Sequence, residues 1–331
     1  MKNPIIVIAG PTASGKTALA VHLAKKLGGE VINADSRSIY REMDLGTGKP
    51  TTEEREGIPH HLFDIADPDE QFSVAEYKKL AEEKIKEIAG RGKIPIIAGG
   101  TMMYIDAVIY NYEMSDTKPN QKLRERLAQK STEEIFSELQ KADSRTAKMI
   151  DSHNRHRLIR ALEIFYETGS PKASEKKKSL PKNVLYLALC EGFGAKAMKS
   201  PSSVIPAQAG IQKNKADSGQ ARMTKGNDRK QLYDRINKRA DVWMKEGFVD
   251  EVKKLLEKYS LGDPGMNGIG YKQVGLYLTG KISLKEATEK FKQGDRNLAK
   301  RQLTWLRRNK DVTWIKNKSE AEKAVKNFLG T

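Results

Sequence analysis

Residues 5–20 read IIVIAGPTASGKTALA, and this stretch decides the fold. A short run of branched apolar residues ends near Gly10, and the octapeptide GPTASGKT at residues 10–17 leads into a helical pattern. The octapeptide matches G-x-x-x-x-G-K-[ST], a loop whose backbone N–H groups surround phosphate oxygens at a helix N-terminus. The sequence therefore predicts a phosphate-binding loop between a buried strand and a helix.

The side chains of this loop have predicted roles. Lys16 is expected to contact the terminal phosphate of the ligand, and the Thr17 hydroxyl is expected to bind Mg²⁺. The motif indicates a diphosphate or triphosphate, but it does not distinguish ATP from other ligands of this kind. The residues expected to bind the phosphates are Gly10, Thr12, Ala13, Ser14, Gly15, Lys16 and Thr17.

Short apolar runs alternate with helical patterns in the N-terminal part, which predicts an α/β fold with a parallel sheet flanked by helices. We expect strands at residues 5–8, 31–34, 94–98, 184–189 and 312–315. The predicted organisation is a P-loop core beginning at 1–112, an inserted helical subdomain at 113–140, a return to the core at 141–197, a flexible insertion at 198–228 and a helical C-terminal part at 229–331.

Composition limits the possible partners. The chain has 60 Lys and Arg against 43 Asp and Glu, a formal net charge of +17, which favours a polyanion such as nucleic acid over a membrane surface. No apolar run reaches the roughly 20 residues of a membrane span. The single cysteine, Cys190, excludes an internal disulfide, and we expect a cytoplasmic protein.

An acidic residue stands in an unexpected place. P-loop NTPases usually have a later strand that ends in a magnesium-binding Asp, but the best such strand here, IPIIAGG at 94–100, ends in glycines. Instead, Asp35 follows the second predicted strand. Because ligands bind at the carboxyl ends of parallel strands, Asp35 is predicted to meet a substrate nucleophile beside the phosphates. The alternative is that Asp35 only caps a turn.

Seven blocks of this sequence together resemble the bacterial tRNA dimethylallyltransferases. That family transfers a five-carbon isoprenoid group from dimethylallyl diphosphate to N6 of an adenosine beside the anticodon. The resemblance covers nearly the whole chain apart from residues 198–228. The blocks are GPTASGKT (10–17), NADSRSIYREMDLGTGKPT (33–51), HHLFDIADPDEQFSVAEY (60–77), AGGTMMYI (98–105), NRHRLIRALEIFYETG (154–169), GIGYKQ (268–273) and AKRQLTWLRR (299–308).

The resemblance implies a role for individual residues. The loop with Lys16 would hold the donor diphosphate, which departs as pyrophosphate, and Arg235 would assist it. Asp35 would accept the proton of the attacking amine, and Thr101, also a candidate N-cap of the following helix, would hydrogen-bond near that amine. Lys16, Asp35 and Thr101 are thus the expected catalytic residues.

The resemblance also implies an RNA-binding surface for the anticodon stem-loop of tRNA, on a protein that acts as a monomer. Cationic residues interleaved with Trp305 suit phosphate contacts and base stacking, and Tyr271 and Lys272 are expected on a loop surface. The expected tRNA-binding residues are Asp35, Ser36, Arg37, Ser38, Thr101, Arg155, His156, Arg157, Leu158, Ile159, Arg160, Gly270, Tyr271, Lys272, Lys300, Arg301, Gln302, Trp305 and Arg307.

The sequence departs from the usual family pattern at Ser38, where Gln is usual, at Met102, where Gly is usual, in the block 155–160, and in segment 198–228.

Three other functions stay open at this point. A P-loop small-molecule kinase could use Asp35 to bind an acceptor hydroxyl, and an adenylate isopentenyltransferase would act on free nucleotide. An RNA-binding protein could use the loop for a regulatory nucleotide.

Overall fold

The computed structural model describes residues 3–114, 117, 120–169, 179–189 and 227–330. Cys190 and nearly all of the predicted insertion at 198–228 lie outside these residues; helix α9 (Asn227–Lys245) begins within its last two positions. Among the described residues, no helix is long and apolar enough to cross a membrane.

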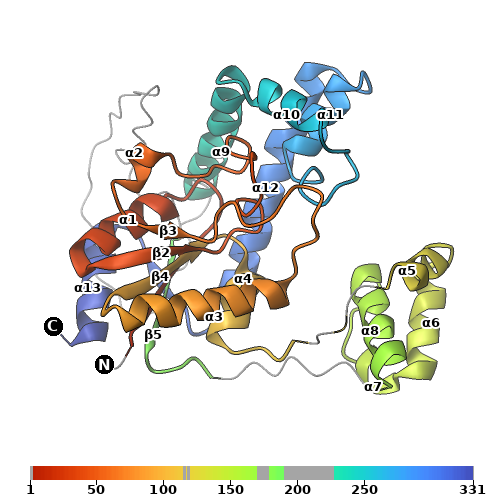
Figure 1. The fold of residues 1–331 in the computed structure, drawn as a ribbon, viewed down its shortest axis with the longest axis horizontal. Coiled ribbons are helices and arrows are strands. Elements are labelled where there is room, and N and C mark those ends of the chain that lie inside the picture. Colours follow the sequence, from red (N-terminus) through yellow and green to blue (C-terminus); the bar gives the residue numbers. More distant parts are fainter. Residues whose placement is uncertain (1–2, 115–116, 118–119, 170–178, 190–226, 331) are drawn as a thin grey trace. The chain divides into compact units, whose positions relative to one another are not determined.

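A six-stranded parallel sheet forms the centre of the larger unit, with the strand order β3-β2-β4-β1-β5-β6 (Figure 1). This confirms the predicted fold class, and the five predicted strands are present with ends that differ by at most two residues. The two-residue strand β3 was not predicted because it is too short to show a period. The strands are β1 (Ile5–Ala9), β2 (Gly29–Asn33), β3 (His60–His61), β4 (Ile94–Gly99), β5 (Val184–Leu189) and β6 (Thr313–Ile315).

Helices cover the sheet, so its inner strands β1, β4 and β5 are built of apolar residues, whereas β2 also carries Glu30 and Asn33. Helices α1 (Lys16–Leu27) and α13 (Lys318–Leu329) pack in one cluster with Ile6 and Ile8 of β1. Helices α3 (Val74–Gly90) and α4 (Met102–Ile109) contact β4 and each other. Their rings of Tyr77 and Tyr104 stack with centroids 4.0 Å apart. The expected capping box of Ser73 and Glu76 begins α3.

The C-terminal helices form a second cluster with the long loop that follows β2. Helices α9, α10 (Phe248–Leu256), α11 (Tyr271–Leu278) and α12 (Leu284–Arg308) contribute most of it, and the loop, which includes the short helix α2 (Thr52–Arg55), brings Ile39 and Met43. Gly46 fits against the ring of Phe248, where a Cβ atom would lie 2.3 Å away. Glu251 of α10 accepts hydrogen bonds from the Leu45 N–H (2.8 Å) and the Tyr271 hydroxyl (2.5 Å).

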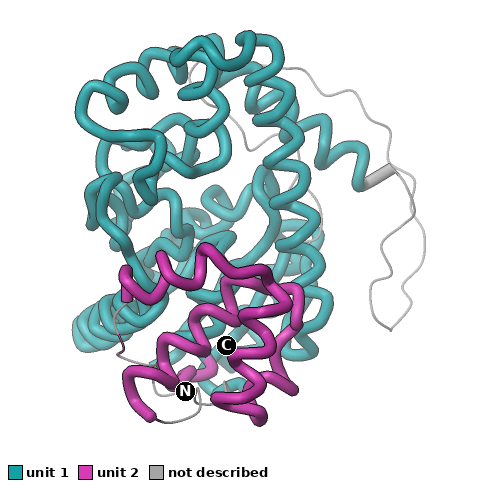
Figure 2. The backbone as a smooth tube through the Cα atoms, turned by 90° about the vertical axis from the view of Figure 1, so that its right-hand side faces the viewer, with its two compact units in different colours: residues 1–109, 180–331 teal, residues 110–179 magenta. Residues whose placement is uncertain are grey.

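The chain divides into two compact units, residues 1–109 with 180–331, and residues 110–179 (Figure 2). The second unit contains α5 (Gln121–Ala128), α6 (Thr132–Ala142), α7 (Ser144–Ala147) and α8 (Arg155–Thr168) around its own core. The predicted subdomain at 113–140 is therefore too short, and the predicted return to the core at 141 is wrong. The reason is that the apolar face of α8, with Leu158 and Leu162, packs in this second core.

A buried charge cluster lies at the amino end of β2. Glu30, 3% exposed, accepts hydrogen bonds from Lys93 (2.8 Å), Arg91 (2.8 Å) and His61 (2.7 Å). Burial alone would raise the pKa of Glu30, but the hydrogen bonds from Lys93 and His61, together with the charge of Arg91, lower this pKa to about 2. Because the folded state holds the ionised form, this carboxylate stabilises the fold above its unfolded pKa of roughly 4.3 and loses that effect as the pH falls.

The substitution Glu30→Gln is therefore expected to lower the free energy of unfolding by about 2 kcal/mol at pH 7. The difference from wild type should shrink steadily between pH 5 and pH 3, as measured by urea denaturation. Glu87→Gln is the matched control, since Glu87 also pairs with Arg91 but is exposed, so that its replacement should change the stability little. Equal stability of the two variants at pH 7 would contradict this account.

Candidate active site

The predicted phosphate-binding loop connects β1 to α1, as its motif requires. Ala13 and Gly15 have positive φ angles of 59° and 86°, so the loop turns its backbone sharply just before the helix. The first N–H groups of α1 have no acceptor within the helix, and they form its positive end. The local geometry therefore suits an anion at this position.

The base of the loop is closely packed. A Cβ atom on Gly10 would lie 2.8 Å from the Ser14 Oγ and 3.3 Å from Leu189 of β5. Ser14 is buried, and its hydroxyl has no hydrogen-bond partner among the residues that the structure describes. A side chain at position 10 would thus crowd Ser14 and Leu189, and the Ser14 hydroxyl is a buried polar atom of the loop.

Lys16 begins α1, and its ammonium donates a hydrogen bond to the Pro11 carbonyl (2.8 Å). Burial lowers the pKa of Lys16 from 10.5 to about 8; the negative charge of Asp35 opposes this shift, and the positive charge of Arg239 adds to it. The lysine and the aspartate are therefore close enough to interact electrostatically. A bound anion would stabilise the charged form of the lysine.

Asp35 lies two residues after β2. Its backbone N–H donates to the Asn33 side chain (3.0 Å), and its Oδ1 accepts from the Arg37 N–H (2.9 Å). Asp35 therefore caps a turn, as the alternative interpretation of the sequence predicted, but this cap uses one of its two carboxylate oxygens. The other, Oδ2, faces Gly100, where a Cβ atom would lie 3.5 Å away. The same carboxylate can cap a turn and receive a proton.

Thr101 follows β4 and is tied to the residue after Asp35. Its Oγ1 accepts from the Ser36 N–H (2.9 Å) and donates to the Ser36 Oγ (3.1 Å), while its own N–H donates to the Ala34 carbonyl (3.0 Å). The expectation that this hydroxyl also caps α4 stays a prediction, since an oxygen that accepts one hydrogen bond from Ser36 keeps a second lone pair. Thr101 and Asp35 thus lie side by side at the ends of neighbouring strands.

Two arginines of α9 reach the loop, of which only the first was predicted. Arg235 Nε donates to the Ala13 carbonyl (3.3 Å). Arg239 donates to the Thr12 hydroxyl (2.6 Å) and to Asp295 of α12 (2.8 Å), and its guanidinium lies 4.4 Å from the centroid of the Trp243 ring. The sequence could have indicated Arg239, because it follows Arg235 by four residues and therefore lies on the same face of the helix.

The residues expected to bind tRNA from α12 separate into two groups. Gln302 is buried, and its amide accepts from the Thr12 N–H (2.8 Å) and donates to the Gly100 carbonyl (2.9 Å). Trp305 is half-buried, and its indole N–H donates to Asp106 of α4 (2.8 Å). The remaining three side chains, Lys300, Arg301 and Arg307, are exposed.

The loop before α11 differs from expectation. Tyr271 is 1% exposed and meets the Phe248 ring edge to face, so its predicted surface position is wrong: its ring is apolar enough to join the core and its hydroxyl has a buried acceptor. Lys272 is exposed. Gly270 has a φ of 90° at the start of α11, which allows the chain to turn beside Phe248.

The expected cluster on α8 belongs to the second unit and is partly structural. Arg155 donates to three carbonyls at the end of α5, and Arg160 donates to Glu163 and to the Thr117 carbonyl. Leu158 and Ile159 pack in the core of this unit. The other two side chains of the predicted cluster, His156 and Arg157, are exposed.

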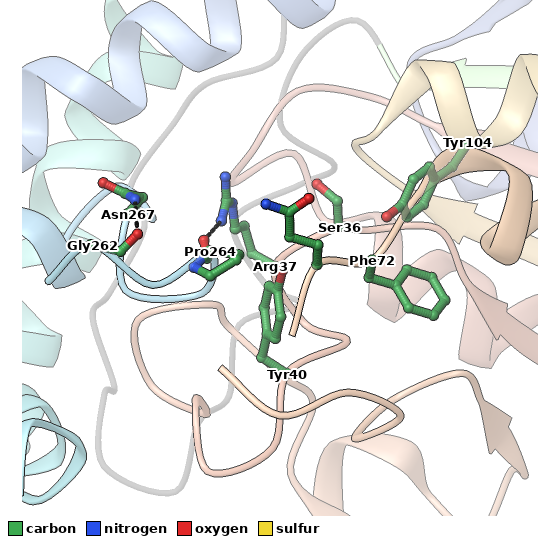
Figure 3. Close-up of a pocket in the computed structure, with 9 residues that line it drawn as sticks. Ser36, Arg37, Tyr40, Phe72, Tyr104, Gly262, Pro264 and Asn267 are labelled. Atoms are coloured by element: carbon green, nitrogen blue, oxygen red, sulfur yellow. Dashed lines mark hydrogen bonds between the residues drawn. The ribbon is translucent and has the colours of Figure 1, made fainter. Parts of the chain in front are cut away.

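A pocket of about 450 Å³ is lined by Ser36 and Arg37, the two residues that follow Asp35 in the chain (Figure 3). Two lining residues are joined by a hydrogen bond from Arg37 to the Pro264 carbonyl (2.8 Å), and Ser38 is buried but does not line the pocket. Aromatic rings combined with polar groups suit a flat, hydrogen-bonding ligand such as a nucleobase. The lining residues are Ser36, Arg37, Tyr40, Gln71, Phe72, Tyr104, Gly262, Pro264 and Asn267.

The described residues include no cluster of three His, Cys, Asp or Glu side chains that could hold a metal ion. A Mg²⁺ ion in this loop would therefore depend on ligand oxygens from a diphosphate, as is usual for magnesium at phosphate sites. The exposed hydroxyl of Thr17 at the start of α1 fits the part of the single protein ligand.

The sequence is similar to those of known proteins. The sequence model of the family described as IPP transferase matches residues 38–309. A tRNA dimethylallyltransferase of Acetivibrio thermocellus is 42% identical over 98% of this chain and 96% of its own length, and one of Anoxybacillus flavithermus is 40% identical over 95% and 91%.

Solved structures show the same similarity. The full-length tRNA isopentenylpyrophosphate transferase of Bacillus halodurans is 36% identical, with a TM-score of 0.66 over 99% of this chain and 96% of that one. A eukaryotic dimethylallyltransferase described as acting on tRNA is 27% identical, with a TM-score of 0.73 over 95% and 73%. The chain that carries this phosphate-binding loop and the adjacent Asp35 therefore belongs to the IPP transferase family of tRNA dimethylallyltransferases.

Proposed function

We propose that this chain transfers a dimethylallyl group from dimethylallyl diphosphate to N6 of an adenosine beside the anticodon of tRNA, with release of pyrophosphate. Its relatives carry the name of this activity. The observation that carries the proposal is that the Asp35 carboxylate lies at a strand end within electrostatic reach of Lys16 in the phosphate-binding loop. A proton acceptor and an anion site are thus neighbours, as a transfer from a diphosphate to an amine requires.

On the donor side, the chain's own groups stabilise a leaving diphosphate. The backbone N–H groups of residues 13–17, the ammonium of Lys16 and the guanidinium groups of Arg235 and Arg239 all lie at the loop. Such preorganised positive groups act on charge that develops in the transition state. Mg²⁺ held by Thr17 would supply further neutralisation of the phosphate oxygens.

On the acceptor side, Asp35 and Thr101 would hold the adenine amine. The N6 lone pair forms a bond to C1 of the dimethylallyl group while the bond from C1 to the diphosphate oxygen breaks, and the N6 proton passes to the Asp35 carboxylate. The adenine must leave its stack to reach this point, at a cost of a few kcal/mol. The pocket lined by Tyr40 and Tyr104 offers room for bases on this path.

The tRNA would be held by the exposed cationic side chains. Lys272, Lys300, Arg301 and Arg307 of the larger unit are free of the structural roles found for Gln302 and Tyr271, and His156 and Arg157 provide a similar surface on the second unit. We propose that the protein acts as a monomer. A cytoplasmic location agrees with the single cysteine and with tRNA as the substrate.

The other functions that the sequence left open are not favoured. A small-molecule kinase or an enzyme that acts on free adenylate binds a small substrate, which does not account for a net charge of +17. Family membership also disfavours an RNA-binding protein without catalytic activity.

Asp35→Asn tests the proton acceptor. The amide keeps the size of the side chain but cannot accept a proton from N6, so kcat for prenyl transfer should fall by roughly 10²-fold or more. The dissociation constant for tRNA, measured by filter binding, should change by less than about threefold, because a neutral isostere removes no phosphate contact. Asp250→Asn, on the exposed surface of α10, is the control and should retain activity.

Retention of activity by Asp35→Asn would refute its role as the base. The same assay run with γ-labelled ATP separates a kinase from a prenyltransferase. Transfer of label to any acceptor, together with an absence of prenylated adenosine, would refute the proposed function.

The lowered pKa of Lys16 predicts how donor binding depends on pH. The terminal phosphate of dimethylallyl diphosphate is ionised above a pKa of roughly 6, so between pH 7 and 9 the lysine is the group that titrates. Since the charged ammonium binds the anion and its pKa in the free protein is about 8, affinity should fall as the pH rises. Calorimetry without tRNA should show a dissociation constant roughly tenfold larger at pH 9 than at pH 7.

Lys16→Ala should bind the donor more weakly at pH 7 and should lose this dependence on pH. A variant that kept the wild-type slope would show that another group titrates in this range, against the assignment of the lysine to the diphosphate.

A further inference from the structure

One buried amide connects the two halves of the site. Gln302 of α12 is 5% exposed, and its side chain accepts a hydrogen bond from the Thr12 N–H of the phosphate-binding loop (2.8 Å). The same amide donates to the carbonyl of Gly100 (2.9 Å), the residue between β4 and Thr101. Residues on the donor side and on the acceptor side are thus linked through one side chain.

The chemistry of this position is selective for glutamine. A carboxamide provides an acceptor and a donor on an uncharged group, whereas an ionised Glu only accepts and a Lys only donates. An ionised Glu would also place a negative charge beside the loop that binds an anion. The approach further requires a glycine, because a Cβ atom on Gly100 would lie 2.4 Å from the Gln302 Nε2.

The surroundings hold this amide in place. Ala299 and Leu303, on either side of Gln302 along α12, pack with Ala13 of the loop and with Ile236 of α9. The ion pair of Arg239 and Asp295 joins α9 to α12, and Arg239 also donates to the Thr12 hydroxyl. Thr12 is therefore held at two atoms, its N–H by Gln302 and its hydroxyl by Arg239.

We propose that Gln302 is a positioning residue that sets the distance between the bound donor and the attacking amine. It does so by fixing Thr12 of the phosphate-binding loop relative to Gly100, and hence to Thr101 and Asp35. This inference rests on the prenyl transfer proposed above. It replaces the tRNA contact expected from sequence, because both polar ends of the amide already have partners within the protein. A misplacement of about 1 Å can cost 10²-fold in rate.

Gln302→Leu tests the proposal, with Gln293→Leu as the matched control. Gln293 lies on the same helix, but it is exposed and its amide hydrogen-bonds to its helix neighbours Asn297 and Arg296. Gln302→Leu should lower kcat roughly 30- to 100-fold, while the dissociation constants for tRNA and the donor change by less than about threefold. Gln293→Leu should behave as wild type.

A conservative variant distinguishes positioning from general damage to the fold. In Gln302→Glu, the protonated carboxylic acid can both accept and donate, whereas the ionised form cannot donate. The kcat of this variant, divided by that of wild type at each pH, should therefore rise as the pH is lowered from 8 to 6. A merely structural defect would give a ratio independent of pH, and so would overturn the proposal.

A double-mutant cycle with Gly100→Ala completes the test. Its added methyl group displaces the amide from the same bridge, so the double variant should be no slower than the slower single variant. If the losses in kcat of the two single variants added in the double variant, the proposed link through Gln302 would be refuted. It would also be refuted if Gln302→Leu left kcat unchanged and weakened tRNA binding tenfold or more. Absence of prenylated adenosine with the wild-type protein would instead refute the proposed function, and this inference with it.

Discussion

The end of β4 sets the constraint on which the site depends. Because β4 lies between β1 and β2 in the sheet, the phosphate-binding loop and Asp35 can meet only across that strand end. Gly99 and Gly100 make this possible: a Cβ atom on Gly99 would lie 2.1 Å from the Ala34 carbonyl, and one on Gly100 would meet Gln302. The glycines at this strand end, where a P-loop NTPase usually has an Asp, therefore let the backbone that precedes Asp35 and the amide of Gln302 pack closely against it.

The C-terminal helices add side chains to the site at the ends of the strands. Helices α9 and α12 contribute Arg235, Arg239 and Gln302 to the loop between β1 and α1, and Asp295 pairs with one of these arginines. On the other side, Glu251 of α10 holds the loop that follows Asp35. The basic C-terminal part is thus not an appended surface, because side chains of α9 and α12 contact the loop proposed to bind the diphosphate.

Local patterns allowed much of this to be predicted from the sequence. The loop motif, the apolar strands and the capping box of α3 each depend on residues close together in the chain, and the structure has all three. The position of Asp35 followed from the rule that ligands bind at the carboxyl ends of parallel strands. The role of Thr101 beside it came from the family resemblance.

Contacts between distant segments could not be predicted in this way. Gln302 and Thr12 are separated by 290 positions, and no local period shows that a polar residue in a basic helix turns inward. Tyr271 and Leu158 were assigned to RNA from their neighbours in the motifs, although their apolar surfaces pack in cores. The boundary of the second unit was misplaced for a similar reason, since the partner of an amphipathic helix is a tertiary property.

The most direct test of the account is a crystal structure of this protein with an anticodon stem-loop and an unreactive analogue of dimethylallyl diphosphate. The account predicts that the diphosphate lies in the loop of residues 10–17, with the adenine N6 within hydrogen-bond distance of Asp35 and Thr101 and facing C1 of the analogue across Gly99 and Gly100. A complex in which the analogue or the adenine occupies another part of the molecule would contradict it.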